Sequence, residues 1–198
     1  MTRARNFANV ISGNFDLPAT ALDNAGGAGL IHLNTTSLTS SDSANSISFT
    51  QMDSSAYSHY VIICRCAITT DSIMYARFLD SSDAEITGTN YYQYTGSTSS
   101  TQMTLHSDVV GDGANNETGF HGRFDISIKQ AAANKNVSPS VLVTAGMVEN
   151  AGTIFLSQNY NHLRPDLSTT QPEGIKIYLS STDTFKHAVF SLFAYAES

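Results

Sequence analysis

The sequence lacks tryptophan altogether, has only two cysteines and is poor in charge. Charged residues make up 14% of its 198 residues, well below the roughly 25% that is usual for a soluble domain. Ten basic and 17 acidic side chains leave a formal net charge of −7. Because no cluster of Lys or Arg offsets this acidic balance, nucleic acid is not an expected partner.

The two cysteines are too few for a disulfide framework. Cys64 and Cys66 are two residues apart on a predicted strand, so both side chains point to the same face. Neighbours on one strand do not easily reach disulfide geometry. We therefore expect two reduced cysteines that serve packing, in a protein made in a reducing cytoplasm.

Long apolar runs are also missing. The longest, Tyr60–Cys64, is interrupted by Arg65, and no stretch approaches the ~20 residues that a helix needs to cross a bilayer. The basic first residues are not followed by an apolar stretch, so no secretory signal is predicted. Membrane insertion is therefore not expected.

Sequence motifs of common enzymes are absent from the chain, including G-x-S-x-G, H-E-x-x-H and the phosphate-binding G-x-x-x-x-G-K. The six histidines are spread over different predicted strands and loops, and the acidic residues lie mostly in turns. We therefore predict no catalytic residues, no cofactor and no enzymatic activity.

Small hydroxyl residues are abundant, with 26 Ser and 21 Thr. From Ile47 onward, apolar residues alternate with polar ones at a period of two, which is typical of strands that bury one face. About nine such segments follow one another, separated by turns rich in Gly, Asn, Asp and Ser. The pattern predicts an all-β fold, an antiparallel β-sandwich that is jelly-roll-like.

The first 45 residues differ from this pattern and are predicted to form an extended N-terminal anchoring arm that ends in a Ser/Thr spacer. Residues 46–198 are predicted to form the sandwich. The arm has large apolar side chains but is too short for a core of its own, so they are expected to dock on a partner. Its two arginines are expected to pair with acidic groups there. The predicted anchoring residues are Arg3, Arg5, Phe7, Ile11, Phe15, Leu17 and Leu22.

Tyr91, Tyr92 and Tyr94 lie beside a hydroxyl-rich segment, residues 95–100. Aromatic side chains next to a polar loop suit a sugar ring or a partner protein. The alternative is that they fill one end of the sandwich, because most aromatic residues serve packing.

A loop rich in oxygen-bearing side chains is a weak candidate for calcium, through Asp112, Asn115, Asn116 and Glu117. Its spacing is not that of an EF-hand, and the alternative is a turn with glycines at positive φ. No other metal site is predicted.

Three segments are notable in their order along the chain: Arg3–Asn9 followed by Leu22–Asn24, then Val110–Gly122, then Gly174–Ser181. Together they resemble segments of tail-fibre and other structural proteins of marine bacteriophages. Arg3–Asn9 followed by Leu22–Asn24 resembles their N-terminal SRARNLAN…ALDN leader. Val110–Gly122 is similar to their VGN-x-x-NE-x-x-G-x-x-G segment, and Gly174–Ser181 to their I-x-I-x-x-SSG strand and turn. The chain departs from the family in its last strand, which lacks the glycines of the G-x-x-x-LYG ending.

The resemblance implies a non-enzymatic virion protein, either a tail fibre or a capsid decoration or head-fibre component. It also implies that the leader binds other virion proteins, that the sandwich forms a homotrimer, and that the protein is located on the virion. A host-surface glycan is a candidate partner of the exposed sandwich. A stand-alone carbohydrate-binding, lectin-like module is the alternative function, and a polysaccharide-cleaving enzyme is a third.

Overall fold

The computed structural model describes residues 29–68, 72–88, 91–93, 96–110, 120–128, 138–148, 154–163, 170–180 and 183–195. These residues form twelve strands and one short 3-10 helix, η1 (Ser40–Asp42). The strands are β1 (Leu30–Thr39), β2 (Ser46–Phe49), β3 (His59–Ile68), β4 (Ser72–Leu79), β5 (Tyr91–Gln93), β6 (Gly96–Ser100), β7 (Met103–Val110), β8 (Phe120–Ser127), β9 (Ser140–Val148), β10 (Ile154–Leu163), β11 (Gly174–Leu179) and β12 (Phe185–Tyr195).

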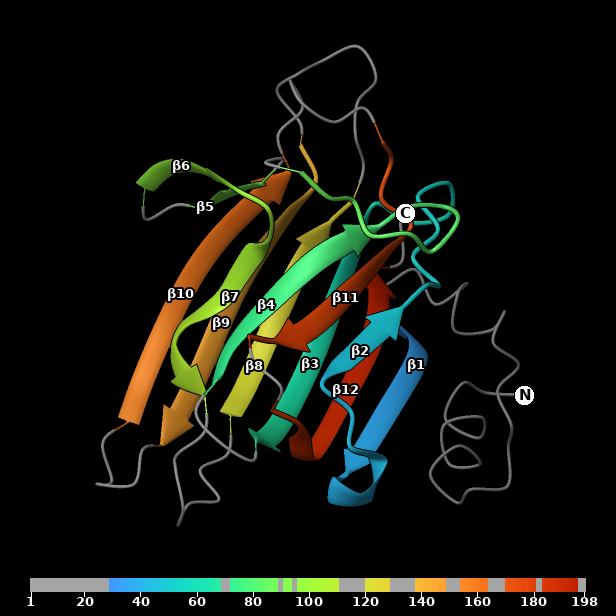
Figure 1. Cartoon of the computed structure of the whole chain (residues 1–198). Coiled ribbons are helices and arrows are strands. Elements are labelled where there is room, and N and C mark those ends of the chain that lie inside the picture. The colour runs from blue at the N-terminus through green and yellow to red at the C-terminus, as the bar shows by residue number, and fades with distance from the viewer. Residues whose placement is uncertain are drawn as a thin grey trace, which may run out of the picture.

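The strands form two antiparallel sheets that pack face to face (Figure 1). The pairs are nested along the chain, since β1 pairs with β12, β2 with β11, β3 with β8 and β4 with β7. Successive pairs alternate between the large and the small sheet. This arrangement is that of a jelly roll, in which one long folded-back ribbon wraps around a common core. The predicted all-β antiparallel sandwich is therefore confirmed.

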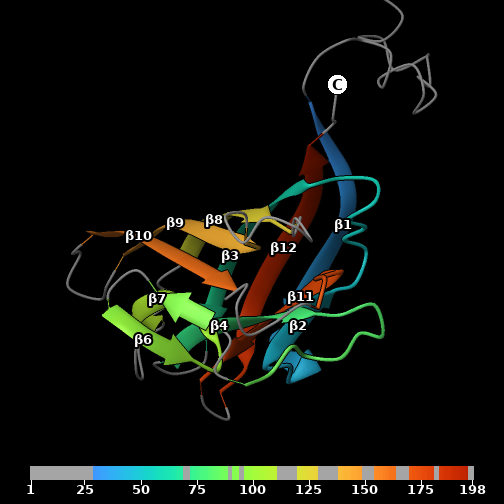
Figure 2. The same cartoon turned by 90° about the horizontal axis from the view of Figure 1, so that it is seen from above.

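Two additional hairpins make the sheets unequal. The hairpin β5–β6 lies between β4 and β7 in the chain, and β9–β10 lies between β8 and β11. Both join the same sheet, which has the order β1-β12-β3-β8-β9-β10-β5-β6, whereas the other has the order β2-β11-β4-β7. The view from above shows the small sheet covering one side of the large one (Figure 2). The other side of the large sheet is thus an outer face.

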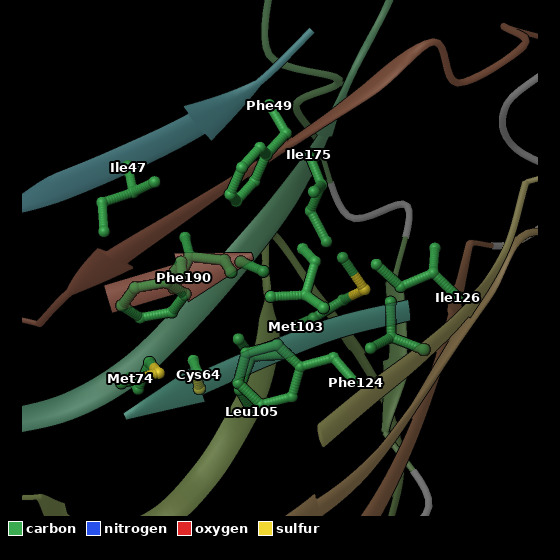
Figure 3. Close-up of a cluster of buried hydrophobic side chains, with 14 of the residues drawn as sticks. Ile47, Phe49, Cys64, Met74, Met103, Leu105, Phe124, Ile126, Ile175 and Phe190 are labelled. Atoms are coloured by element: carbon green, nitrogen blue, oxygen red, sulfur yellow. The ribbon is translucent and has the colours of Figure 1, made fainter. Parts of the chain in front are cut away.

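Every second residue of the strands points into the space between the sheets, as the period of two predicts. Along β8, Phe120, Gly122, Phe124 and Ile126 are buried, and the residues between them are more exposed. Figure 3 shows side chains of both sheets meeting in this core, and the labelled residues are Ile47, Phe49, Cys64, Met74, Met103, Leu105, Phe124, Ile126, Ile175 and Phe190.

Two asparagines of β10 link the sheets at one edge of the sandwich. The side-chain amide of Asn159 donates to the carbonyl oxygen of Leu105 at 3.2 Å, and that of Asn161 donates to Thr104 at 3.0 Å. Both carbonyls belong to β7, the last strand of the small sheet. Asn161 is only 1% exposed, and this bond pairs its buried Nδ2, whereas its Oδ1 is buried without a hydrogen-bond partner among the described residues.

The sandwich begins earlier than predicted. Leu30–Thr39 forms β1, an edge strand of the large sheet, so the predicted boundary at residue 45 is wrong for this part of the chain. The predicted Ser/Thr spacer is partly strand because its hydroxyl groups pair across strands, as Thr35 and Ser191 do at 2.8 Å. Gly96–Ser100, expected as a loop, likewise forms strand β6 against β5.

Candidate interaction surface

On the outer face of the small sheet, polar side chains pair with one another. Glu85 accepts hydrogen bonds from Arg77 at 2.5 Å and from Lys176 at 2.6 Å. The guanidinium of Arg77 also lies 5.4 Å from the ring centre of Tyr178, a cation–π contact. The hydroxyl of Tyr178 donates to Gln102 at 2.7 Å, and burial raises its pKa to about 12. The charges of this face are therefore satisfied within the chain.

The outer face of the large sheet is different, because an apolar row crosses it from β12 to β10. The register places Val61 opposite Phe193 on one side and Asp125 on the other. Asp125 is opposite Leu142, which is opposite Tyr160. We call Phe193, Val61, Leu142 and Tyr160 the apolar row. Val61 is 0% exposed although it points away from the core between Tyr60 and Ile62, so its neighbours on this outer face already cover it.

Large exposed apolar side chains gather on this same face. The described residues include five of them, with exposed fractions between 40% and 83%. Their register positions place all five on the outer face of the large sheet and none on that of the small sheet. They are Leu30, Ile63, Leu142, Leu156 and Tyr160. Single exposed apolar residues are ordinary on a monomer, whereas a contiguous patch marks an interaction surface. Leu142 and Tyr160 are cross-strand partners and form such a contiguous pair.

One carboxylate interrupts the apolar row, and its charge is balanced locally. Asp125 accepts two hydrogen bonds from the Nε of Arg123 at 2.9 and 3.1 Å and one from its Nη2 at 2.7 Å. The same Nη2 donates to the hydroxyl of Tyr195 at 2.8 Å. The carboxylate therefore does not need water to balance its charge, which lowers the free-energy cost of covering the row.

Aromatic rings extend the row toward β5. The ring of His162 lies 5.8 Å from that of Tyr160 and 5.2 Å from that of Tyr92. At the other end of the row, on β1, the ring of His32 packs edge-on against that of Phe193, with 5.3 Å between the ring centres. Such rings contribute large contact area with few rotatable bonds, which suits an interface.

The three tyrosines predicted as a glycan or partner contact do not act as one group. Tyr91 is 0% exposed. Its hydroxyl donates a hydrogen bond to the Ile86 carbonyl oxygen at 2.8 Å and accepts one from the Phe78 backbone N–H at 3.1 Å. Burial raises its pKa. Tyr91 is therefore a core residue, as alternation along a short strand requires, and the prediction that it contacts a ligand is wrong. Tyr92 is half-buried on the other face, and Tyr94 lies outside the described residues.

The two cysteines are free and buried on the core face of β3, as predicted. Burial raises the pKa of both thiols, that of Cys66 to about 12. Since the thiolate is the reactive form, these cysteines are inert packing residues.

The anchoring residues Arg3, Arg5, Phe7, Ile11, Phe15, Leu17 and Leu22 all lie outside the described residues, as do the calcium candidates Asp112, Asn115, Asn116 and Glu117. Among the side chains that the structure describes, no group of three or more His, Cys, Asp or Glu could hold a metal ion. The same described residues contain no helix with the length and apolar character of a membrane span.

Sequence reasoning did not identify the apolar row, although one signal for it was present. Tyr60–Ile63 is apolar at four successive positions, which is typical of a strand covered on both faces. A strand with one face in water would place polar residues at Val61 and Ile63. Leu142 and Phe193 also lie in short apolar runs, Val141–Val143 and Leu192–Tyr195, whereas Tyr160 stands between two asparagines and carries no such signal.

Comparison with known proteins gives no family for this chain. No family model matches it, and no curated protein sequence matches it. Among solved structures, it is similar to a crystal structure of a plant- and prokaryote-conserved (PPC) protein from Pyrococcus horikoshii. That match has a TM-score of 0.35 and 8% sequence identity over 88% of this chain and 85% of the other.

Proposed function

We propose that this protein is a non-enzymatic structural component of a bacteriophage particle, attached by its N-terminal arm and displayed as an oligomer of β-sandwiches. The observation that supports self-association is the outer face of the large sheet, which carries the apolar row and all five large exposed apolar side chains of the described residues. A second copy of this chain is the proposed occupant of that face.

The size of the face fits this occupant. Six adjacent strands, from β1 to β10, at about 4.8 Å spacing and ~3.3 Å per residue give a face of about 800 Å². A stable protein interface buries about 800 Å² on each partner. The apolar row and the flanking aromatic rings supply the apolar centre that such an interface needs. Asp125 lies within it, and its charge is paired with that of Arg123.

The phage assignment is supported by the resemblance of the three sequence segments to structural proteins of marine bacteriophages. A jelly roll whose two faces differ in polarity suits this role, because one face can join copies while the opposite face stays in water. A homotrimer is the proposed assembly, and oligomerisation would multiply weak contacts with a host surface.

Self-association is tested by analytical ultracentrifugation of the full chain over a range of concentrations. The native protein is expected to sediment as an oligomer, with a mass of three chains. Ile63→Lys introduces a charge at the centre of the outer face, where Ile63 is 45% exposed, and is expected to give a monomer. A native protein that stays monomeric at every concentration would exclude the proposed interface.

Ile73→Lys is the matched control. Ile73 is a half-buried isoleucine on the outer face of the small sheet, between the core residues Ser72 and Met74. The variant should remain an oligomer, since that face has no proposed partner. Equal dissociation by the two substitutions would point to a general loss of folding, which circular dichroism of both variants would reveal.

The location on a particle is tested separately, by immunogold electron microscopy of phage preparations with antibodies against the purified sandwich. Label on the head favours a decoration or head-fibre protein, and label on the tail favours a fibre. Particles that contain no copy of the chain would overturn the phage assignment while leaving the self-association result intact.

A further inference from the structure

A basic hollow of about 520 Å³ opens at one end of the outer face of the large sheet. It lies where β3 ends and β12 begins, at the lower end of these strands in Figure 1. Its lining comes from η1, β3, β8 and β12, and the residues are Ser40, Arg65, Cys66, Ala67, His121, Lys186 and His187. Four of the seven are Arg, Lys or His, and none is acidic, although the whole chain has a net charge of −7.

Strand pairing brings these basic side chains together from distant parts of the sequence. Arg65 of β3 is directly opposite His121 of β8, and His187 of β12 is opposite Ala67 of β3. Cross-strand partners on one face have Cβ atoms about 5 Å apart. Arg65 and both imidazoles therefore border one small volume.

A β-bulge adds the fourth basic residue. The β12–β3 register shifts between Phe185 and His187, so Lys186 is the extra residue of the bulged strand. As a result Lys186 and His187 are two successive exposed residues in a strand that otherwise alternates. Bulges redirect side chains in this way and are frequent beside binding sites. This one turns a lysine toward the hollow instead of the core.

Arg65 differs from the other basic residues whose ion pairs the structure describes. Arg77 and Lys176 contact Glu85, and Arg123 contacts Asp125, whereas no described carboxylate contacts Arg65. A guanidinium presents a planar set of donors that matches two oxygens of a carboxylate or phosphate. Arg65 is therefore a donor for an oxyanion that the described part of the chain does not supply.

We propose that this hollow binds the oxyanion group of an acidic sugar, such as a uronate or a sugar phosphate, with Arg65 as the principal contact. The volume lies in the range of small-molecule sites, about 300–1,000 Å³, and exceeds what a bare inorganic anion would fill. The remaining space adjoins the Ser40 side chain and the two imidazoles, which can hydrogen-bond sugar hydroxyls. The proposal goes beyond the structural role and does not depend on it. Arg65 and His121 lie four residues along β3 and β8 from Val61 and Asp125, so a copy centred on the apolar row leaves this end of the face open.

Isothermal titration calorimetry of the full chain in its native assembly tests this site. The probes are glucuronate, glucose 6-phosphate, neutral glucose and inorganic phosphate. Glucuronate or glucose 6-phosphate should bind saturably, and more tightly than both glucose and phosphate. Comparing the two acidic sugars identifies whether carboxylate or phosphate is preferred. Absence of binding by both acidic sugars, or equal binding of inorganic phosphate, would overturn the proposal.

The decisive variant is Arg65→Gln, which removes the charge and keeps the side-chain length. It should weaken binding of the acidic sugar by at least about tenfold, the loss expected for a charge-assisted hydrogen bond. Lys176→Gln is the matched control, because it removes one positive charge on the outer face of the small sheet and Lys176 does not line the hollow. Its affinity should stay within about twofold of the native protein. An equal loss in both variants would mean non-specific attraction to a basic surface and would reject the site.

Discussion

The two sheets of the sandwich present outer faces with different chemistry. On the small sheet, Glu85 joins Arg77 and Lys176, and Tyr178 packs beneath the guanidinium. On the large sheet, Leu142 and Tyr160 of the apolar row are exposed, and Arg65 has no described carboxylate partner. One face thus satisfies its polar groups within the chain, whereas the other leaves both apolar area and a cation for something outside it.

The difference follows from strand number as much as from composition. Both faces are built from strands with the same alternation, and both share one core (Figure 3). The small sheet is four strands wide, and charged side chains reach across it to each other. The large sheet is twice as wide, and apolar residues from four of its strands, β12, β3, β9 and β10, line up in one row on its outer face. Strand number and composition together therefore give the large sheet an outer face that suits a partner.

The largest expected effect tests whether the two faces belong to one cooperative unit. A Cβ at Gly174 of the small sheet would lie 2.5 Å from the backbone oxygen of Phe49, and backbone cannot move aside. Gly174→Ala should therefore lower the free energy of unfolding by about 2 kcal/mol, measured by urea denaturation. Hydrogen exchange should rise together in β11 and β8, since one core serves both sheets. If hydrogen exchange rises in β11 alone, the two sheets unfold independently and do not form one cooperative unit.

Gly122→Ala is the matched substitution in the large sheet. There a Cβ would approach the ring edge of Phe120 at 2.7 Å and the Cys64 sulfur at 3.1 Å. Because these are side-chain atoms that can shift, the loss should be about 1 kcal/mol, smaller than at Gly174. A larger loss than at Gly174 would contradict this explanation.

A smaller effect is expected from the ion cluster of the small sheet. Hydrogen bonds from Lys176 and Arg77 lower the pKa of Glu85 below its ordinary value of 4.5. The carboxylate therefore stabilises the folded chain at pH values above 4.5, and this stabilisation is lost as the pH falls through the lowered folded-state pKa. Glu85→Gln should cost about 1 kcal/mol at neutral pH. The difference between native and variant should shrink below pH 4.5 in denaturant titrations, and a constant difference would rule out the ion pairs as its source.

The smallest effect is expected from the ion pair of the large sheet. The Asp125 and Arg123 side chains are 32% and 49% exposed and neighbours on one strand, so the pair is more hydrated than that of Glu85. In the monomeric Ile63→Lys background, Asp125→Asn should change stability by no more than about 0.5 kcal/mol. A loss that equals or exceeds that of Glu85→Gln would show that the outer face of the large sheet is as self-contained as the small one.

Much of the fold could be predicted from alternation in the sequence. The strands from Ser46 to Tyr195 follow the period of two, and the sandwich follows from their number and spacing. β1 was missed because Thr35–Thr39 is almost entirely hydroxyl residues, which resemble a linker in isolation. Their strand form depends on β12, whose Ser191 pairs with Thr35 across 156 residues of sequence.

The candidate surface was less predictable, since the residues that lie next to one another on a sheet face come from strands far apart in the sequence. The sequence by itself determined that strands would form, that Cys64 and Cys66 would share a buried face, and that the surface would carry little charge. Only the tertiary structure decided that Val61, Phe193 and Tyr160 share one row, and that Arg65 has His121 and His187 beside it. The reason is physical: alternation fixes which way each side chain points, whereas long-range strand pairing fixes what stands next to it.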